Sequence, residues 1–199
     1  MEKIAILYDA SQAVLSTFDL DEVLSQILAI MRDYFHLRHV AILLLDQETQ
    51  TLRARSHAGW NKESEDSAIP LGSGLIGTAA KLRRPIYAPD VASDPRYIRT
   101  IPSTRSELAV PLLVRNQVVG VLDCQSDVTD FFDNETIDLL TLFSTQASIA
   151  LQNAKLYSQE RRRAVQLGAI NNLSRQTTAV LEMDELLDKI GRASCRERV

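Results

Sequence analysis

Three short apolar runs limit the folds open to this chain more than any other feature. Residues 39–46, 106–114 and 118–126 have the sequences HVAILLLD, SELAVPLLV and VVGVLDCQS. Apolar residues at consecutive positions over such short lengths are typical of strands that are covered on both faces. Only the turn Arg115-Asn116-Gln117 separates the second run from the third, so these two are expected to pair. The chain should therefore build a sheet with a layer of structure on each side.

Amphipathic helices are predicted on either side of this region, at 1–17, at 19–36 and from near Asp133 to about Arg163. The last helix has two apolar rows, and two rows require two partners, one of which can be the domain's own sheet. One row comprises Leu140, Phe143, Ala147, Ala150, Ala154 and Tyr157, and the other Leu139, Leu142, Ile149 and Leu156. Between the strands, a short helix is expected at 75–82 and a long, proline-containing loop at 89–105.

The composition is that of an ordinary globular protein, with 45% hydrophobic and 24% charged residues and a net charge of -4. Lys and Arg are not in clustered excess, so nucleic acid is not expected as a partner. No apolar run approaches the roughly 18 residues of a membrane helix, and the N-terminus lacks the features of a signal peptide. The two cysteines, Cys124 and Cys195, are too few for a disulfide framework, and we expect a cytoplasmic location.

A repeat divides the chain. The sequence FDLDEVLSQI at 18–27 returns as LEMDELLDKI at 181–190, and the apolar phase is kept at this offset. We interpret residues 1–160 as one domain and 161–190 as a linker with the first two helices of a truncated second copy. Residues 191–199 resemble a sequencing adapter read in frame and are interpreted as a non-native tail, with a true linker as the alternative. The chain is expected to be a fragment of a longer protein.

Gly72, Gly74 and Gly77 match the G-x-G-x-x-G pattern of dinucleotide sites. The preceding run is short and contains Pro70, so a turn into a helix N-terminus is favoured, whose N–H groups could bind an anion or a ligand oxygen. No clustered nucleophile, base or metal-ligand set is found, and we expect neither enzymatic activity nor a metal site.

Four other polar residues are candidates for a site. His57 and Cys124 could point into an interior cavity, although a plain sheet-face role is favoured. Glu107 begins an apolar strand, where it could bind loop N–H groups or a ligand, and the loop-structuring role is favoured because loop N–H groups can supply the donors that a partly buried carboxylate needs. Asp90 lies in the long loop, where Asp side chains commonly close turns.

Three stretches occur in order: IPLGSGLIGTAAKLRRPIYAPDVASDPRY, SELAVPLLVRNQVVGVLDCQSD and FFDNETIDLLTLFSTQASIALQNAKLY. Together they resemble the GAF domain, a small-molecule sensor module of bacterial signalling proteins. The resemblance covers about residues 5–160. It implies an α+β fold whose central antiparallel sheet has about six strands, in the layered arrangement typical of such folds. Terminal helices would pack on one face, and the helix at 75–82 and the loop at 89–105 would enclose a ligand pocket on the other.

The pocket candidates under this resemblance are Leu44, His57, Gly74, Ile76, Ala79, Asp90, Tyr97, Glu107, Ala109, Leu122 and Cys124. The ligand and any cofactor stay open. The chain does not complete the Asn-Lys…Phe-x-x-x-Asp-Glu pattern of cyclic-nucleotide-binding members, and Cys124 lacks the Cys-His context of bilin-binding members. No histidine can be placed for haem, and Cys124 is the only credible cysteine where methionine-sulfoxide reductase members need several.

The resemblance implies a non-catalytic sensory and dimerisation region of a bacterial signal-transduction protein. An output domain would follow it in the full-length protein, such as the histidine kinase of a two-component system, a cyclic-dinucleotide enzyme or a phosphatase. The alternative is a degenerate, structural GAF module that only holds a dimer together. The alanine-rich row from Leu140 to Tyr157 is predicted to form the seam of a parallel homodimer, with coiled-coil-like packing beside the helix at 1–17.

Overall fold

The computed structural model describes residues 17–60, 67–99 and 101–196, with side-chain surroundings as far as residue 167. Apart from its last residue, the helix expected at 1–17 lies outside the described residues. No helix among the described residues combines the length and the apolarity needed to cross a membrane.

A six-stranded antiparallel sheet forms the centre of the described part of the chain. The strands are β1 (His39–Asp46), β2 (Thr51–Ala58), β3 (Ala68–Pro70), β4 (Ile86–Ala88), β5 (Ser106–Val114) and β6 (Gln117–Ser126). Their spatial order is β3-β2-β1-β6-β5-β4. The three apolar runs are therefore β1, β5 and β6, each of which has a paired strand on both edges. The expected α+β fold with a central antiparallel sheet is confirmed.

Alternate residues of β1 enter two separate apolar clusters, one on each face of the sheet. Val40 and Ile42 belong to the cluster that includes the large helices, whereas Ala41 and Leu43 belong to the other. All four are fully buried. Because side chains of a strand alternate between faces, a run of consecutive apolar residues is the pattern that such double covering requires.

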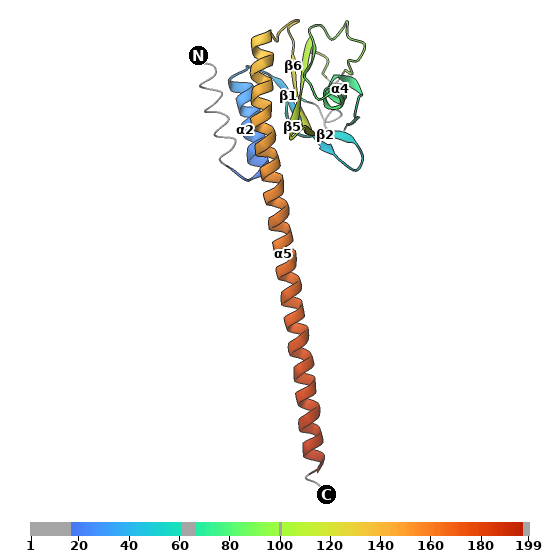
Figure 1. Ribbon diagram of the computed structural model, residues 1–199, viewed down its shortest axis with the longest axis vertical. Coiled ribbons are helices and arrows are strands. Elements are labelled where there is room, and N and C mark those ends of the chain that lie inside the picture. Colours follow the sequence, from blue (N-terminus) through green and yellow to red (C-terminus); the bar gives the residue numbers. More distant parts are fainter. Residues whose placement is uncertain (1–16, 61–66, 100, 197–199) are drawn as a thin grey trace. The chain divides into compact units, whose positions relative to one another are not determined.

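Helices α2 (Leu20–Asp33) and α5 (Asn134–Arg196) supply the layer on one face, and Figure 1 shows α2 beside the first turns of α5. The Asp19 carboxylate caps α2 by accepting hydrogen bonds from the N–H groups of Asp21 and Glu22 at 2.9 and 3.1 Å. Asp133 caps α5 by accepting one from the N–H of Thr136 at 2.8 Å. A carboxylate at the start of a helix accepts hydrogen bonds from N–H groups that would otherwise be unpaired. Its negative charge also interacts favourably with the positive end of the helix dipole.

The alanine-rich row of α5 faces the protein's own sheet. Its first five members, Leu140, Phe143, Ala147, Ala150 and Ala154, are 0–2% exposed and share a cluster with sheet residues. Only Tyr157, at 54% exposure, points away. The prediction that this row forms a dimer seam is therefore wrong, because the small alanine side chains let α5 approach the sheet. Three of the four members of the second row point outward, with Leu142, Ile149 and Leu156 exposed by 56%, 40% and 50%, whereas Leu139 packs against the sheet cluster.

Helix α5 continues without a break to Arg196. Under the repeat, residues 180–182 correspond to the non-helical entry at 17–19, yet they are helical. Residues 191–196, interpreted as part of a non-native tail, also belong to the helix. Residues 169–190 contain neither Gly nor Pro, so nothing in them obliges the backbone to leave the helix. The compact units divide at Leu156, close to the expected boundary at 160, and the second copy stays a prediction.

Neighbouring positions on α5 should respond very differently to a charge. Ala150→Glu would place a carboxylate against the sheet without a partner, and we expect it to lower the free energy of unfolding by at least about 3 kcal/mol. Ile149→Glu, one residue earlier on the outward row, should change it by less than about 1 kcal/mol. Urea denaturation, monitored by circular dichroism, compares the free energies of unfolding of the two variants. Equal losses in the two variants would contradict the assignment of the rows.

Candidate functional site

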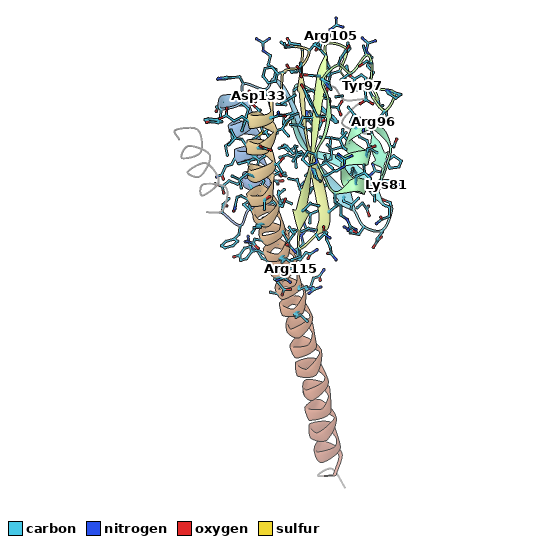
Figure 2. All side chains as sticks on the ribbon, turned by 45° about the horizontal axis from the view of Figure 1, so that its top comes forward. Lys81, Arg96, Tyr97, Arg105, Arg115 and Asp133 are labelled. Carbon is cyan, nitrogen blue, oxygen red and sulfur yellow. The ribbon has the colours of Figure 1, made fainter. Side chains whose placement is uncertain are left out.

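The face of the sheet opposite α2 is covered by helix α4 (Gly74–Leu82) and the loop at 89–105. Figure 2 shows Lys81, Arg96 and Tyr97 on this side of the sheet and Asp133 on the other. From α4, Ile76 and Ala79 enter the same apolar cluster as Ala109 of β5. We call this side the α4 face.

The three glycines build the turn into α4. Gly72 and Gly74 have φ values of +86° and +66°, which side chains rarely adopt, and a Cβ on Gly77 would lie 2.3 Å from the Pro70 carbonyl oxygen. The N–H of Gly72 donates to the Gly77 carbonyl oxygen at 2.7 Å. The surrounding sheet is antiparallel, so the parallel βαβ unit of a dinucleotide site is excluded. The favoured interpretation as a turn is confirmed.

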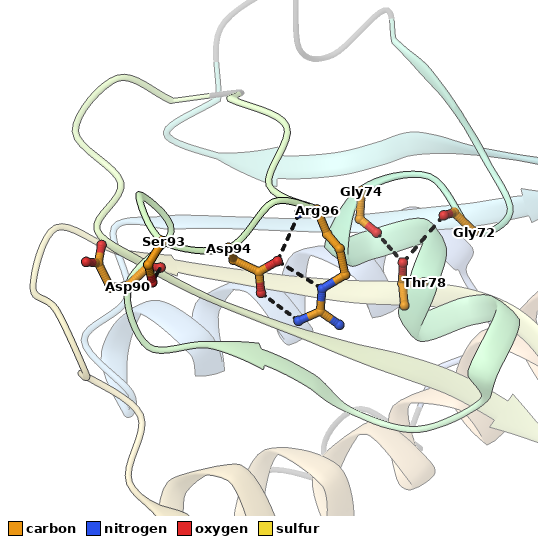
Figure 3. Close-up of polar contacts among 7 residues, drawn as sticks. All are labelled: Gly72, Gly74, Thr78, Asp90, Ser93, Asp94 and Arg96. Carbon is orange, nitrogen blue, oxygen red and sulfur yellow. Dashed lines mark hydrogen bonds and ion pairs between the residues drawn. The ribbon is translucent and has the colours of Figure 1, made fainter.

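Two carboxylates of the loop at 89–105 hold its shape by accepting hydrogen bonds from other residues of the same loop. Asp94 accepts two hydrogen bonds from the Arg96 guanidinium, at 2.9 Å from Nε and 2.6 Å from Nη2, and Figure 3 shows this pair beside the start of α4. The hydrogen bond from Arg96 is the largest effect that lowers the pKa of Asp94. Asp90 accepts from the N–H of Ala92 at 3.0 Å, so it closes a turn, as the sequence predicts. Both carboxylates therefore serve the shape of the loop.

Strand pairing brings two acidic residues together on the α4 face. Asp123 of β6 lies opposite Ala41 of β1 on one side and Ala109 of β5 on the other, and both alanines belong to the α4-face cluster. Glu107 of β5, two residues before Ala109, points the same way and pairs with Gln125. Glu107 is 3% exposed and Asp123 is fully buried. We call Glu107 and Asp123 the acid pair.

A short hydrogen-bond chain holds one side of the acid pair. The Thr104 hydroxyl donates to Gln125 Oε1 at 2.6 Å, and Gln125 Nε2 donates to Asp123 Oδ2 at 2.7 Å. A side-chain hydrogen bond also joins Glu107 to Asp123; it raises the pKa of Glu107 and lowers that of Asp123, so the protonated Glu107 is its donor. The acid pair is therefore hydrogen-bonded within itself as well as to Gln125, as buried polar groups nearly always are.

Burial raises the pKa of both acids. The pKa of Asp123 rises to about 7, chiefly because its charged form is removed from water, while the hydrogen bond from Gln125 opposes the shift. Burial also raises the pKa of Glu107 well above its usual range, and the neighbouring Asp123 charge adds to the effect. The acid pair therefore keeps protons at pH values where exposed carboxyls have lost them.

Aromatic side chains lie around the acid pair on this face. Trp60 is 8% exposed and packs in the α4-face cluster, and its indole N–H has no acceptor among the described residues. Its ring centroid lies 6.3 Å from that of His57, the residue opposite Ala41. Partial burial raises the pKa of Tyr97, and the charges of Glu107 and Asp123 contribute. The loop therefore places the Tyr97 hydroxyl within electrostatic reach of the acid pair.

Several predicted site residues meet on the α4 face, and three do not. Ile76, Ala79 and Ala109 are buried there, and Tyr97 packs against them. Leu44, Leu122 and Cys124 lie on the opposite face, in or against the cluster formed with α2 and α5, so their assignment to the pocket is wrong. The reason is the two-residue period of a strand: Leu122 and Cys124 alternate with Asp123 and Gln125. Gly74 and Asp90 shape the turn and the loop.

Sequence reasoning missed Asp123, Gln125, Thr104 and Trp60. The signal for the first two was present in LDCQS, because an Asp and a Gln at alternate positions of an otherwise apolar strand identify its polar face. Trp60 follows the end of β2, and its orientation depends on Gly59, whose φ is +76°. Thr104 lies in the long loop, where no periodic pattern exists to place it.

The model of the GAF domain family matches residues 19–151. GAF domain-containing protein A of Dictyostelium discoideum is 28% identical over 110 residues, which cover 55% of this chain and 67% of that protein. The chain spans only 44% and 40% of two further curated relatives.

Two solved structures show the same fold at 22% sequence identity. One is the free methionine-R-sulfoxide reductase of Neisseria meningitidis in complex with its substrate, with a TM-score of 0.72 over 78% of this chain and 91% of that one. The other is the GAF domain of an Acinetobacter phosphoenolpyruvate-protein phosphotransferase, with a TM-score of 0.71 over 80% and 98%.

The acid pair predicts an unusual dependence of stability on pH. The pKa of Asp123 is about 7 when folded, against roughly 3.9 in the unfolded chain. Folding therefore takes up protons between these values, and the free energy of unfolding falls as the pH rises through them. Asp123→Asn removes the titration and keeps an acceptor for Gln125. Relative to wild type, the variant should gain on the order of 2 kcal/mol between pH 5 and pH 8.

Urea unfolding of dialysed protein at several pH values tests this expectation. The contributions of the other ionisable groups, which wild type and variant share, largely cancel in the difference. Asp127→Asn, at an exposed carboxyl just beyond β6, is the matched control and should follow wild type at every pH. A difference between Asp123→Asn and wild type that does not change with pH would show that Asp123 is not held protonated in the fold.

Proposed function

The chain belongs to the GAF domain family, and we propose that it is the sensory region of a bacterial signal-transduction protein, binding a small molecule on the α4 face. GAF domains are regulatory modules. The single observation that carries the proposal is the acid pair, because two neighbouring carboxyls buried in an apolar sheet cost folding free energy. Such a cost at one place in an otherwise apolar sheet is typical of a binding site.

The alternative of a purely structural module accounts less well for the same residues. A module that only holds a dimer would be more stable with apolar side chains at 107 and 123, as at the neighbouring Ala109 and Val121. The indole N–H of Trp60 on the same face is buried and has no acceptor among the described residues. This atom fits a ligand that supplies the missing hydrogen bond.

A thiol-based reductase is the enzymatic alternative, since a free methionine-R-sulfoxide reductase is among the similar structures. Thiol chemistry needs a thiolate next to the substrate. Cys124 is a free cysteine, and it lies on the α2 and α5 face with its pKa raised by burial. Its position favours a non-catalytic role for the α4 face.

We propose that helix α5 transmits the effect of ligand binding. Its buried row packs in one cluster with Leu122 and Cys124, the residues on either side of Asp123 in β6. A ligand that favours one position of β6 would therefore favour one position of this part of α5. An output domain such as a histidine kinase would receive the change in the full-length protein. The cytoplasmic location stays a prediction.

The outward row of α5 is the corrected candidate for a dimer seam. Leu142, Ile149 and Leu156 recur at seven-residue intervals, the period of a left-handed coiled coil. Exposure of 40–56% for three large apolar residues in one line is unfavourable unless a partner covers them. We propose a parallel homodimer through this row in place of the alanine-rich one.

Ligand binding on the α4 face can be tested without knowing the ligand. Native mass spectrometry of freshly purified protein, followed by thermal-shift screening with a metabolite library, should reveal a bound small molecule. The double variant Glu107→Gln, Asp123→Asn should weaken its binding at least about tenfold, through the loss of charged hydrogen bonds. Cys124→Ala, on the same strand but the other face, should bind normally. A ligand that binds both variants equally would contradict the proposed site, and the absence of any ligand would favour the structural module.

The dimer prediction uses Ile149→Glu, which the fold is expected to tolerate. Sedimentation velocity over a concentration series should show dimeric wild type, and the variant should need at least about tenfold higher concentration to associate, because a charge is costly in a dry seam. Lys81→Glu, exposed on α4, is the control and should associate like wild type. A wild type that stays monomeric, or an Ile149→Glu variant that associates normally, would contradict the outward row as the seam.

A further inference from the structure

We propose that the connector between β6 and α5, residues 127–133, is a two-state latch whose closed state, held by the Tyr87 hydroxyl and the Pro89 carbonyl, fixes the start of α5. This inference goes beyond the proposed function, because it assigns a conformational device outside the α4 face that operates with or without a ligand. It follows from the backbone conformation of one residue, Asp130, and from the hydrogen bonds around it.

Asp130 has a backbone conformation that costs free energy. Its φ is +53°, in the left-handed region, where Cβ crowds the backbone and where even Asp, which tolerates the region better than most residues, is uncommon. A residue keeps such a conformation only where its surroundings hold it, and such residues gather in switch segments and binding sites. The N–H of Asp130 donates to the Pro89 carbonyl oxygen at 2.8 Å, and its Oδ1 accepts from the Tyr87 hydroxyl at 3.0 Å. Two neighbouring residues therefore hold Asp130 in place.

The setting of Asp130 differs from that of the other non-glycine residues with positive φ in the described part of the chain. Each of the others follows the end of a helix or lies in the turn of a β-hairpin, where left-handed residues are usual. They are His36 and Arg83 after helices, and Gln50, Arg115 and Asn116 in turns. Asp130 instead lies in the connection that leads into a helix, so the turn geometry alone does not account for its conformation.

The Tyr87 hydroxyl joins the connector to the edge of the sheet. It donates to Asp130 and accepts from the N–H of Phe132 at 3.2 Å, so one oxygen atom bonds to both sides of the connector. The rings of Tyr87 and Phe132 also meet edge to face, with their centroids 5.8 Å apart. Burial raises the pKa of Tyr87 to about 12, and the hydrogen bond to Asp130 adds to the shift. The hydroxyl therefore keeps its proton, and with it the donor role, throughout the neutral pH range.

The connector determines how α5 begins. Phe132 is 2% exposed and packs in the same cluster as Leu140 and Phe143 of α5. The next residue, Asp133, caps the helix. Left-handed and right-handed values of φ are separate regions, so Asp130 changes between discrete conformations. Its release would redirect the chain just before Phe132 and the cap, and would loosen the first turns of α5.

Strand β4 connects the latch to the α4 face. Ile86 and Ala88 belong to the α4-face cluster, whereas Tyr87 between them packs against the cluster on the other face. Pro89, the next residue, is the acceptor for the Asp130 N–H. A shift of β4 at the α4 face would therefore move both of the groups that hold Asp130.

The start of β5 supplies two further bonds to the same part of the chain. The N–H of Arg105 donates to the Ser126 carbonyl oxygen at 2.7 Å. The Ser106 hydroxyl donates to the Val128 carbonyl oxygen at 2.8 Å. These bonds hold the first half of the connector on β5, so Asp130 and the residues after it are the part that can change position.

Amide hydrogen exchange of the full chain, measured by NMR without any ligand, tests the latch. Tyr87→Phe removes the hydroxyl and keeps the ring. We expect exchange at least about fivefold faster at Asp130 and at residues 137–140 in the first turns of α5, because both hydrogen bonds of the hydroxyl are lost. A purely local role of Tyr87 would change only Phe132, whose N–H loses its acceptor. Tyr34→Phe, the same substitution at the end of α2, is the matched control and should leave these rates unchanged.

Two variants of Asp130 test the left-handed conformation itself. Asp130→Ala and Asp130→Gly both remove the carboxylate, but only glycine accepts a φ of +53° without steric cost. Residues 137–140 should therefore exchange at least about fivefold faster in Asp130→Ala than in Asp130→Gly. Far-ultraviolet circular dichroism and urea denaturation establish that each variant is folded.

The exchange rates decide between a latch and an ordinary loop. Rates at residues 137–140 that are unchanged in Tyr87→Phe, or that are no faster in Asp130→Ala than in Asp130→Gly, would overturn the latch. Either result would leave the proposed function standing, because these variants keep the acid pair. Failure to find a ligand would contradict the proposed function and leave the latch standing, because the exchange is measured on the free protein.

Discussion

Double covering of the central strands is the constraint on which the rest of this structure depends. Because the central parts of β1, β5 and β6 are buried on both faces, most of their side chains enter one of two closed environments, while strand ends such as Asp46 and Gln117 are exposed. Buried polar groups on these strands cannot reach bulk water and must find partners in the protein or in a ligand. The layer of α2 and α5 is apolar where it meets β6, at Leu122 and Cys124. The polar groups of β6 therefore gather on the α4 face.

That constraint explains both what the sequence allowed us to predict and where prediction failed. Consecutive apolar residues identify strands covered on both faces, and the three runs became β1, β5 and β6. The same property hides which side chain belongs to which face, because burial no longer distinguishes Leu122 from Asp123. The assignment of Leu122 and Cys124 to the site followed from that ambiguity. Glu107 lies on the α4 face, and the loop-binding role expected for it stays a prediction. Trp60 and Thr104 depend on a glycine turn and a loop that have no period.

The two rows of α5 show a related ambiguity on a helix. Alanines permit close packing against any partner, so an alanine-rich row suits a helix seam and a sheet surface equally well. The larger Leu142, Ile149 and Leu156 would fill a sheet interface poorly at the close distance that Ala147 and Ala150 set. Their exposure follows from that distance. Residue size, together with spacing, therefore identifies the row that a sheet can accept.

Because side chains of β6 alternate between the two faces of the sheet, this one strand carries residues of both faces of the domain. Asp123 faces the proposed ligand, while Leu122 and Cys124 on either side of it pack in the cluster that contains Phe143 and Ala147 of α5. A strand cannot shift one of these side chains and leave its neighbours in place, since the backbone carries all three. In the proposed sensory mechanism, close packing on the helix face converts a small movement of β6 into a choice between discrete arrangements of α5. We propose that a ligand which changes the charge of the acid pair alters the balance of forces on β6, and that α5 receives the difference.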